Sequence, residues 1–87
     1  MNELLPIGSV VKLDKDSKID FLIIGYYLVD EETNTCYQYA GTVFPSGLTE
    51  SSKLFLFNHK DITDVLFEGY KENGNTFLSE LQKEMES

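Results

Sequence analysis

The sequence of 87 residues contains no arginine and no tryptophan, and it has one cysteine, one histidine and two prolines. A single cysteine, Cys36, cannot form an intrachain disulfide, which excludes the small secreted proteins that depend on disulfides. The longest apolar run, residues 21–29, is far shorter than the roughly 20 residues that a membrane-spanning helix needs. The N-terminal residues lack the features of a signal peptide. We therefore expect a cytoplasmic protein without membrane insertion.

Positive charge is also scarce in this chain. Seven lysines stand against fifteen acidic residues, and the formal net charge is −8. Nucleic-acid-binding proteins gain affinity by neutralising phosphates, a task for which arginine is well suited. A chain of this charge is repelled by phosphate backbones and by anionic membranes, which argues against both as partners. Two interpretations of the acidity stay open, namely solubility and attraction toward a basic partner protein.

The composition that remains is that of one small globular domain over residues 1–87. Hydrophobic residues make up 41% of the chain and aromatic residues 13%, which is enough for a core. Strand-like patterns occur in residues 7–13, 21–29, 36–44, 54–57 and 64–70. Residues 21–29 are apolar on both alternating faces, as a central strand requires, and Gly25 within them predicts a bulge or a sharp bend.

A helix is predicted from Thr76 to about Glu86, with Asn75 as its N-cap. Its apolar residues fall on one face at helical spacing: Phe77, Leu78, Leu81 and Met85. This face either packs against the sheet or binds a partner. The predicted fold class is α+β: a small, strongly bent antiparallel sheet or an SH3-like barrel of about five strands, spanning residues 7–70, followed by the C-terminal helix.

Motifs for metal binding and catalysis are missing. The acids Asp14, Asp16 and Asp20 alternate as in a calcium-binding loop, but Ile19 stands where such a loop needs glycine and Gly25 where it needs glutamate. His59 has no second histidine or cysteine pair with which to bind zinc. Cys36 lies in an apolar, aromatic run without a neighbouring base, so we expect a buried or half-buried thiol rather than a nucleophile. We expect no catalysis, no metal and no cofactor.

The candidate protein-binding residues are tyrosines and acids. Five tyrosines are too many for so small a core to bury, and surplus tyrosine is typical of protein interfaces, although cross-strand pairing would explain them equally well. The acidic loop Asp30, Glu31 and Glu32 joins the two tyrosine-rich strands that carry Tyr26 and Tyr39. We therefore predict a protein-binding surface made of these five residues, while homo-oligomerisation stays open.

Four groups of residues carry a family resemblance when taken in order. They are residues 4–11, residues 22–25, residues 37–41 with Pro45 and Gly47, and residues 57–62 with 65–70. In this order and spacing the chain, over about residues 3–70, resembles a domain-of-unknown-function family of Gram-positive bacteria whose genes sit beside type VII secretion and LXG-toxin genes. The matched glycines, together with Asn58, His59 and Asp61, look like turn formers, and the resemblance brings no catalytic residues.

The resemblance implies a small accessory protein, acting as an adaptor, chaperone or targeting protein, that engages an LXG toxin or a secretion component before export. Two alternatives stay open at this point. An acidic protein of this size also suits an immunity protein that neutralises a toxin domain. A regulatory barrel that binds a small ligand is the third interpretation, and it would show a pocket lined by tyrosines.

Overall fold

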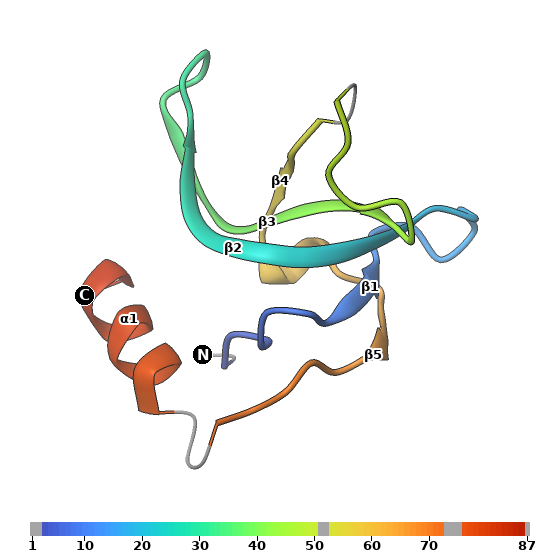
Figure 1. The fold of residues 1–87 in the computed structure, drawn as a ribbon. Coiled ribbons are helices and arrows are strands. Elements are labelled where there is room, and N and C mark those ends of the chain that lie inside the picture. The colour runs from blue at the N-terminus through green and yellow to red at the C-terminus, as the bar shows by residue number, and fades with distance from the viewer. Residues whose placement is uncertain (1–2, 51–52, 73–75, 87) are drawn as a thin grey trace.

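The computed structural model describes residues 3–50, 53–72 and 76–86. They form β1 (Val10–Lys12), β2 (Asp20–Asp30), β3 (Thr35–Phe44), β4 (Phe55–Phe57), the 3₁₀ turn η1 (His59–Asp61), β5 (Asp64–Phe67) and α1 (Thr76–Glu86). The strands make one antiparallel sheet in the order β4-β3-β2-β1-β5, so β4 and β5 are its edges (Figure 1). The predicted α+β class is confirmed, and of its two forms the structure has the bent open sheet.

The long hairpin of β2 and β3 is the frame of the sheet. The two strands pair from Asp20 opposite Phe44 to Asp30 opposite Thr35, and the register shifts between Ile23 and Gly25. This bulge confirms the irregularity predicted at Gly25 and increases the local bend of the strand. Tyr27 follows with a φ of 54°, a left-handed conformation that interrupts the extended backbone. Beyond these two features the hairpin curves away from the rest of the sheet (Figure 1).

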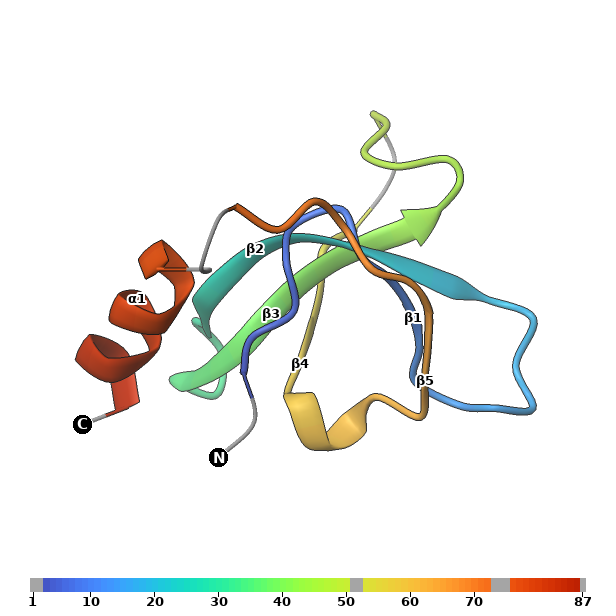
Figure 2. The ribbon, with the colours of Figure 1, turned by 90° about the horizontal axis from the view of Figure 1, so that it is seen from below.

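The core lies on one face of the sheet, where the N-terminal segment crosses it (Figure 2). Its buried cluster comprises Leu4, Val11, Ile23, Tyr39 and Phe57. Val11 and Ile23 alternate along their strands with Val10 and Leu22, so the latter pair belongs to the opposite face. We call the side that carries Val10 and Leu22 the outer face. The opposite side, which carries the buried cluster, is the inner face, and other residues of this chain pack against it.

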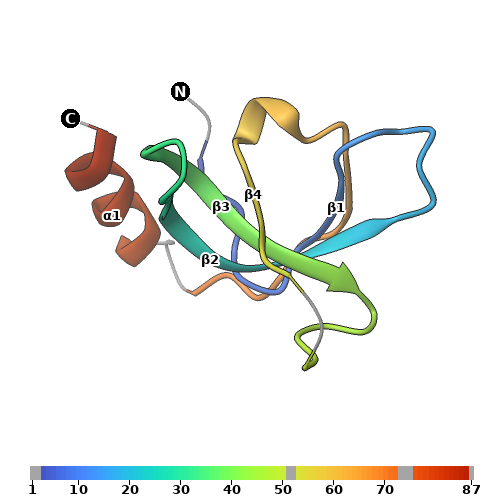
Figure 3. The same ribbon diagram turned by 90° about the horizontal axis from the view of Figure 1, so that it is seen from above.

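The helix α1 lies beside the hairpin end of the sheet (Figure 3). Leu78 packs against the core, whereas Phe77 is 75% exposed and Met85 is also exposed, so the predicted apolar face is covered only in part. Glu86 ties the end of α1 to the sheet by accepting hydrogen bonds from Tyr27 Oη and Gln38 Nε2. The predicted N-cap, Asn75, lies outside the described residues. At eleven residues, α1 is too short and too polar to span a membrane.

The first and the last predicted strands are several residues shorter in the structure, and in each a glycine lies close to the shortened end. Gly8 has a φ of 94° and lies in a turn, so β1 begins only at Val10 rather than near residue 7. The last strand ends at Phe67 rather than Tyr70, because Gly69 turns in against the backbone of residues 7–9 and donates its N–H to Ser9 Oγ. These two close approaches join the beginning of the sheet to its last strand.

The prediction that Cys36 is buried or half-buried is wrong, since its side chain is exposed. It pairs with Val29 near the tip of the hairpin. The exposed residues Leu28 and Val29 show that other described elements leave this end of the hairpin uncovered. The apolar pattern of the strand therefore overstates the burial there.

Replacement of Gly69 tests the close approach between the two chain segments. A Cβ at this position would lie 2.3 Å from the carbonyl oxygen of Ile7, a contact that backbone atoms cannot yield to cheaply. We expect Gly69→Ala to lower the free energy of unfolding by about 1–3 kcal/mol in urea denaturation. Gly25→Ala is the matched control, because its Cβ would meet nothing closer than 3.8 Å. Equal stability of the two variants would contradict the close approach.

Candidate functional site

The predicted acidic loop forms the tip of the β2–β3 hairpin. Asp30 closes the turn, since its carboxylate accepts from the backbone N–H of Glu32 at 3.0 Å and its carbonyl accepts from Asn34 N–H at 2.7 Å. Glu31 and Glu32 are exposed. Three neighbouring acids at the tip of an exposed hairpin therefore present negative charge to solvent, as the sequence predicted.

The two predicted tyrosines do not join these acids. Tyr39 is fully buried, so the expectation that it provides an exposed contact surface is wrong, and Tyr26 is half-buried beside it with ring centroids 6.0 Å apart. The reason is the bend of the hairpin, which turns both rings toward the core. Tyr37 borders the acids instead. It helps to line a hollow of about 500 Å³ beside β4, whose other lining residues are Asp30, Glu32 and Lys53 to Leu56.

Tyr39 is the centre of a hydrogen-bonded cluster inside the fold. Its hydroxyl accepts from the backbone N–H of Leu5 at 2.9 Å and shares a hydrogen bond of 2.8 Å with Nδ1 of His59. Its ring stacks on Phe57 with centroids 5.7 Å apart. The hydroxyl of Tyr26 donates to the carbonyl of Leu5, so both tyrosines hold the N-terminal segment. These contacts serve the structure rather than a partner.

Burial also changes the acidity of this cluster. Loss of solvent raises the pKa of Tyr26 to about 12, and the neighbouring Tyr39 adds to the shift. Burial likewise raises the pKa of Tyr39, against the donation from Leu5. With their pKa values raised in this way, both tyrosines keep their hydroxyl protons to a higher pH than an exposed tyrosine does.

His59 is fixed by the same cluster and by the strand beside it. Its backbone N–H donates to Gln38 Oε1 at 2.8 Å, and Asn58 Oδ1 accepts from Gln38 N–H at 3.0 Å. The turn η1 begins after Asn58, whose N–H donates to the carboxylate of Asp61. The predicted role of His59 as a turn organiser fits these contacts. Within the described ranges, no three histidine, cysteine or acidic side chains gather as metal ligands would.

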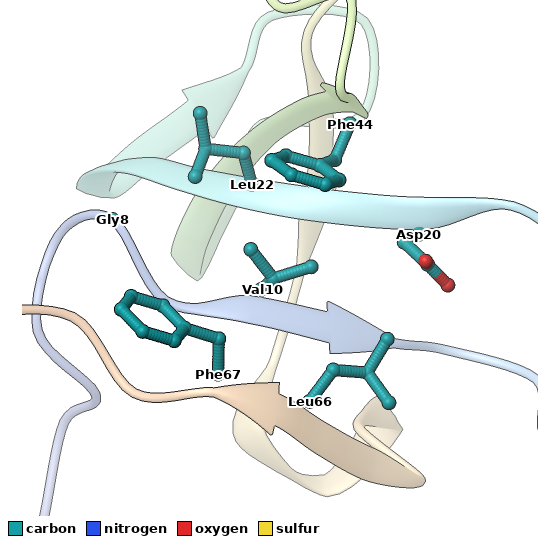
Figure 4. A pocket seen from close by; sticks show the side chains of 7 residues that line it. All are labelled: Gly8, Val10, Asp20, Leu22, Phe44, Leu66 and Phe67. Carbon is teal, nitrogen blue, oxygen red and sulfur yellow. The ribbon is translucent and has the colours of Figure 1, made fainter.

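A second candidate surface lies on the outer face. It is a hollow of about 440 Å³ between β1, β2, β5 and the end of β3 (Figure 4). Its walls are mostly apolar, and its lining residues are Gly8, Val10, Asp20, Leu22, Phe44, Leu66 and Phe67. Phe67 is 62% exposed, Leu66 49% and Phe44 43%. Large apolar side chains are thus presented to solvent together rather than scattered singly.

Asp20 is the one carboxylate in the wall of this hollow, and its charge is compensated. Lys12 Nζ lies 2.6 Å from Asp20 Oδ1 and also donates to the carbonyl of Ser17 at 3.0 Å. Both side chains of the ion pair are only about a quarter exposed or less. The pair orders the entrance of β2 against β1, and it leaves the hollow apolar in character.

A smaller hollow of about 220 Å³ follows along the chain from β5 toward α1. It is lined by Pro6, Ile7, Tyr26, Tyr70, Glu72, Phe77 and Leu78. Tyr70 is 88% exposed, the greatest exposure among the large hydrophobic residues that the structure describes. Exposed apolar side chains therefore continue past the end of β5.

Comparison with known proteins places this fold in a family. A model of the family described as a domain of unknown function, DUF4176, matches residues 4–78. The chain belongs to this family. The match runs from the N-terminal segment through all five strands to the first residues of α1, and it confirms the resemblance to a domain-of-unknown-function family. It carries no statement about secretion, so that link stays a prediction. No curated protein and no protein of solved structure matches the chain.

The sequence did not identify the outer-face residues as a candidate surface, because their pattern fits more than one environment. Val65, Leu66 and Phe67 are consecutive apolar residues, a pattern that a strand covered on both faces also has. Only the structure shows that β5 is an edge strand and that all four of its residues are exposed. The exposed tyrosine that the sequence could have favoured is Tyr70, because it follows Gly69 at the end of the last apolar run.

Removal of one hydroxyl tests the central role of Tyr39. Tyr39→Phe leaves the N–H of Leu5 and the ring nitrogen of His59 without their partner, and we expect a loss of about 1–3 kcal/mol in the free energy of unfolding. Tyr37→Phe is the control, since Tyr37 is half-buried at the hairpin, and we expect it to change stability by less than about 0.5 kcal/mol. The two variants are compared by urea denaturation. Similar, small losses of stability would show that the Tyr39 hydroxyl does not have this central role.

The raised pKa of Tyr26 predicts a loss of stability at alkaline pH. The folded value of about 12 exceeds the ordinary value of 10.0, so the unfolded chain releases this proton first. The stabilisation is complete below pH 10 and is lost as the pH rises toward 12. We expect Tyr26→Phe to lose less stability than the unmodified chain between pH 9 and pH 11.5, as followed by urea denaturation. Identical losses would show that Tyr26 does not titrate differently on folding.

Proposed function

We propose that this protein is a non-catalytic adaptor or chaperone that binds a partner protein through its outer apolar face. The observation that carries the proposal is the joint exposure of Phe44, Leu66 and Phe67 around one apolar hollow. Folded monomers rarely leave such residues uncovered together, and patches of this kind mark interaction sites. The partner we propose, on the strength of the sequence resemblance, is a type VII secreted LXG toxin before its export.

The outer hollow suits a protein side chain better than a small polar ligand. Its wall offers one carboxylate, Asp20, which already pairs with Lys12, so few polar groups remain to orient a ligand. Among the described residues, the outer hollow has no tyrosine in its lining, and the hollow that Tyr26 and Tyr70 help to line is small, at about 220 Å³. These observations favour an apolar anchor from another chain.

An immunity protein is the second candidate, and the hairpin tip is the observation that favours it. Asp30, Glu31 and Glu32 present three acids beside the hollow that Tyr37 lines. Acids placed in this way complement a basic active cleft and accelerate association with it. In this alternative the contact is made with the toxic C-terminal domain, whereas an adaptor engages the export region.

Co-expression with the two halves of an LXG toxin, the proposed partner, separates the two candidates. We expect the N-terminal export region to co-purify with the chain and the C-terminal toxic domain not to. Leu66→Glu should weaken this capture at least about tenfold, because it places a charge in the apolar contact. Leu54→Glu is the matched control, because Leu54 has the same exposure of 49% but lines the hollow beside β4.

Each other outcome of this experiment has a definite meaning. Capture of the toxic domain alone, lost when Glu31 and Glu32 are changed to lysine, would establish the immunity alternative. Capture of neither half would refute an LXG toxin as the partner. Equal effects of Leu66→Glu and Leu54→Glu would remove the outer face from the contact.

A further inference from the structure

The strand β5 presents an edge that no described element covers. It pairs with β1 on one side, with Val10 opposite Phe67 and Val11 opposite Val65, and it ends the strand order on the other. All four of its residues are exposed. An edge strand offers backbone N–H and C=O groups to any further strand, and native proteins guard such edges with lysine, proline, bulges or a covering segment. Figure 1 shows β5 along the margin of the sheet.

The guarding features differ between the two edges of this sheet. Lys53 lies just before β4, and β4 itself has a buried Phe57 and a half-buried Leu56. Residues 62–68 contain no lysine and no proline, and Val65, Leu66 and Phe67 expose 49–62% of their surface. The bulge in the β1–β5 pairing lies on β5 itself, because Val10 and Val11 pair with Phe67 and Val65 and leave Leu66 as the extra residue. It lets the consecutive residues Leu66 and Phe67 line the same hollow. Apart from this bulge, β5 has none of the guarding features named above, so its edge is the more open of the two.

The charges at this edge select the kind of strand that fits. Asp64 and Glu68 stand at the two ends of the exposed apolar residues, and the chain as a whole carries −8. Glu68 Oε2 lies 3.8 Å from Lys71 Nζ, but both side chains are exposed, so this pair is weak and leaves Glu68 able to contact an incoming cation. A second copy would bring the same acids and the same net charge to the edge, which repels it. A strand with lysine or arginine is attracted instead.

Building on the function proposed above, we propose that the partner docks by adding a basic, extended strand to β5. Its backbone pairs with the free edge, and its alternate side chains enter the outer hollow against Leu66 and Phe67. Its lysine or arginine side chains meet Asp64 and Glu68. Three paired residues suffice for β1 in this sheet, and β5 itself pairs with β1 through three residues, Asp64, Val65 and Phe67. The sheet then gains a sixth strand beside β5.

Selection from a random twelve-residue phage-displayed peptide library on the intact chain tests this inference without any assumption about the toxin. We expect enriched peptides to carry net positive charge and to alternate apolar residues at every second position. Binding of the synthesised peptide should slow amide hydrogen exchange at residues 64–67. No enrichment, or enriched peptides that are acidic or lack the alternation, would overturn the proposal.

Backbone methylation of the selected peptide distinguishes strand addition from contact of side chains alone. Only alternate amides of an added strand face β5, so N-methylation of one set should abolish binding and N-methylation of the other set should leave it. Methylation that acts equally at all positions, or at none, would refute pairing at the edge. The readout is fluorescence anisotropy of the labelled peptides.

A pair of charge-matched variants tests the acids. Asp64→Asn with Glu68→Gln should weaken peptide binding about threefold to tenfold and flatten its salt dependence. Glu31→Gln with Glu32→Gln removes the same charge at the hairpin tip and should leave binding within about twofold. Equal losses would show a response to net charge only, which overturns the proposed site.

Amide hydrogen exchange of the protein without peptide is the remaining test. Protection of residues 64–67 that grows with the concentration of the chain alone would assign the edge to a second copy and overturn the proposal. Failure of the peptide experiments alongside capture of the toxin would reject strand addition and keep the adaptor function. Success of the peptide experiments without capture of the toxin would keep strand addition and reject the adaptor function for an LXG toxin.

Discussion

The hydroxyl of Tyr39 is the contact on which the arrangement of this small fold depends. From β3 it reaches the backbone of Leu5 in the N-terminal segment and the ring of His59 at the start of η1, while its ring stacks on Phe57 of β4. Residues far apart in sequence are thereby held at one point of the inner face. A phenol does this well because the ring contributes apolar contact area and the hydroxyl satisfies polar groups that the same contact removes from water. Phenylalanine at this position would fill the space without satisfying the polar groups.

Placing these contacts on the inner face determines what remains on the outer one. The N-terminal segment and Leu78 of α1 cover the inner face, so the chain has no further described element with which to cover Leu22, Phe44 and Phe67. A domain of this size buries a smaller share of its surface than a larger one. In the function proposed above, a partner chain covers this outer face.

Much of the fold could be predicted from local pattern, and the candidate surface could not. The alternation of apolar residues and Gly25 indicated the strands, the central position of residues 21–29 and the bulge, because these depend on neighbours in sequence. The burial of Tyr39 and the exposure of Leu66 depend on which strands lie beside one another. Tyr39 and Leu66 belong to equally apolar runs, yet one strand is internal and the other is an edge. Cys36 illustrates the same limit, since its strand is internal but extends past its neighbours at the hairpin tip.

The negative charge of the chain affects which strands can pair with the open edge at β5. An exposed apolar edge exposes a protein to pairing between its own copies, and lysine is the usual guard against it. This chain has a net charge of −8 instead, with Asp64 and Glu68 at the ends of the exposed residues. Acids repel another copy of the same chain and attract a basic strand, whereas lysines at the edge would repel that same strand. In the strand addition proposed above, negative charge both limits self-association and favours a basic partner, so the proposal assigns the acidity a role in binding in addition to solubility.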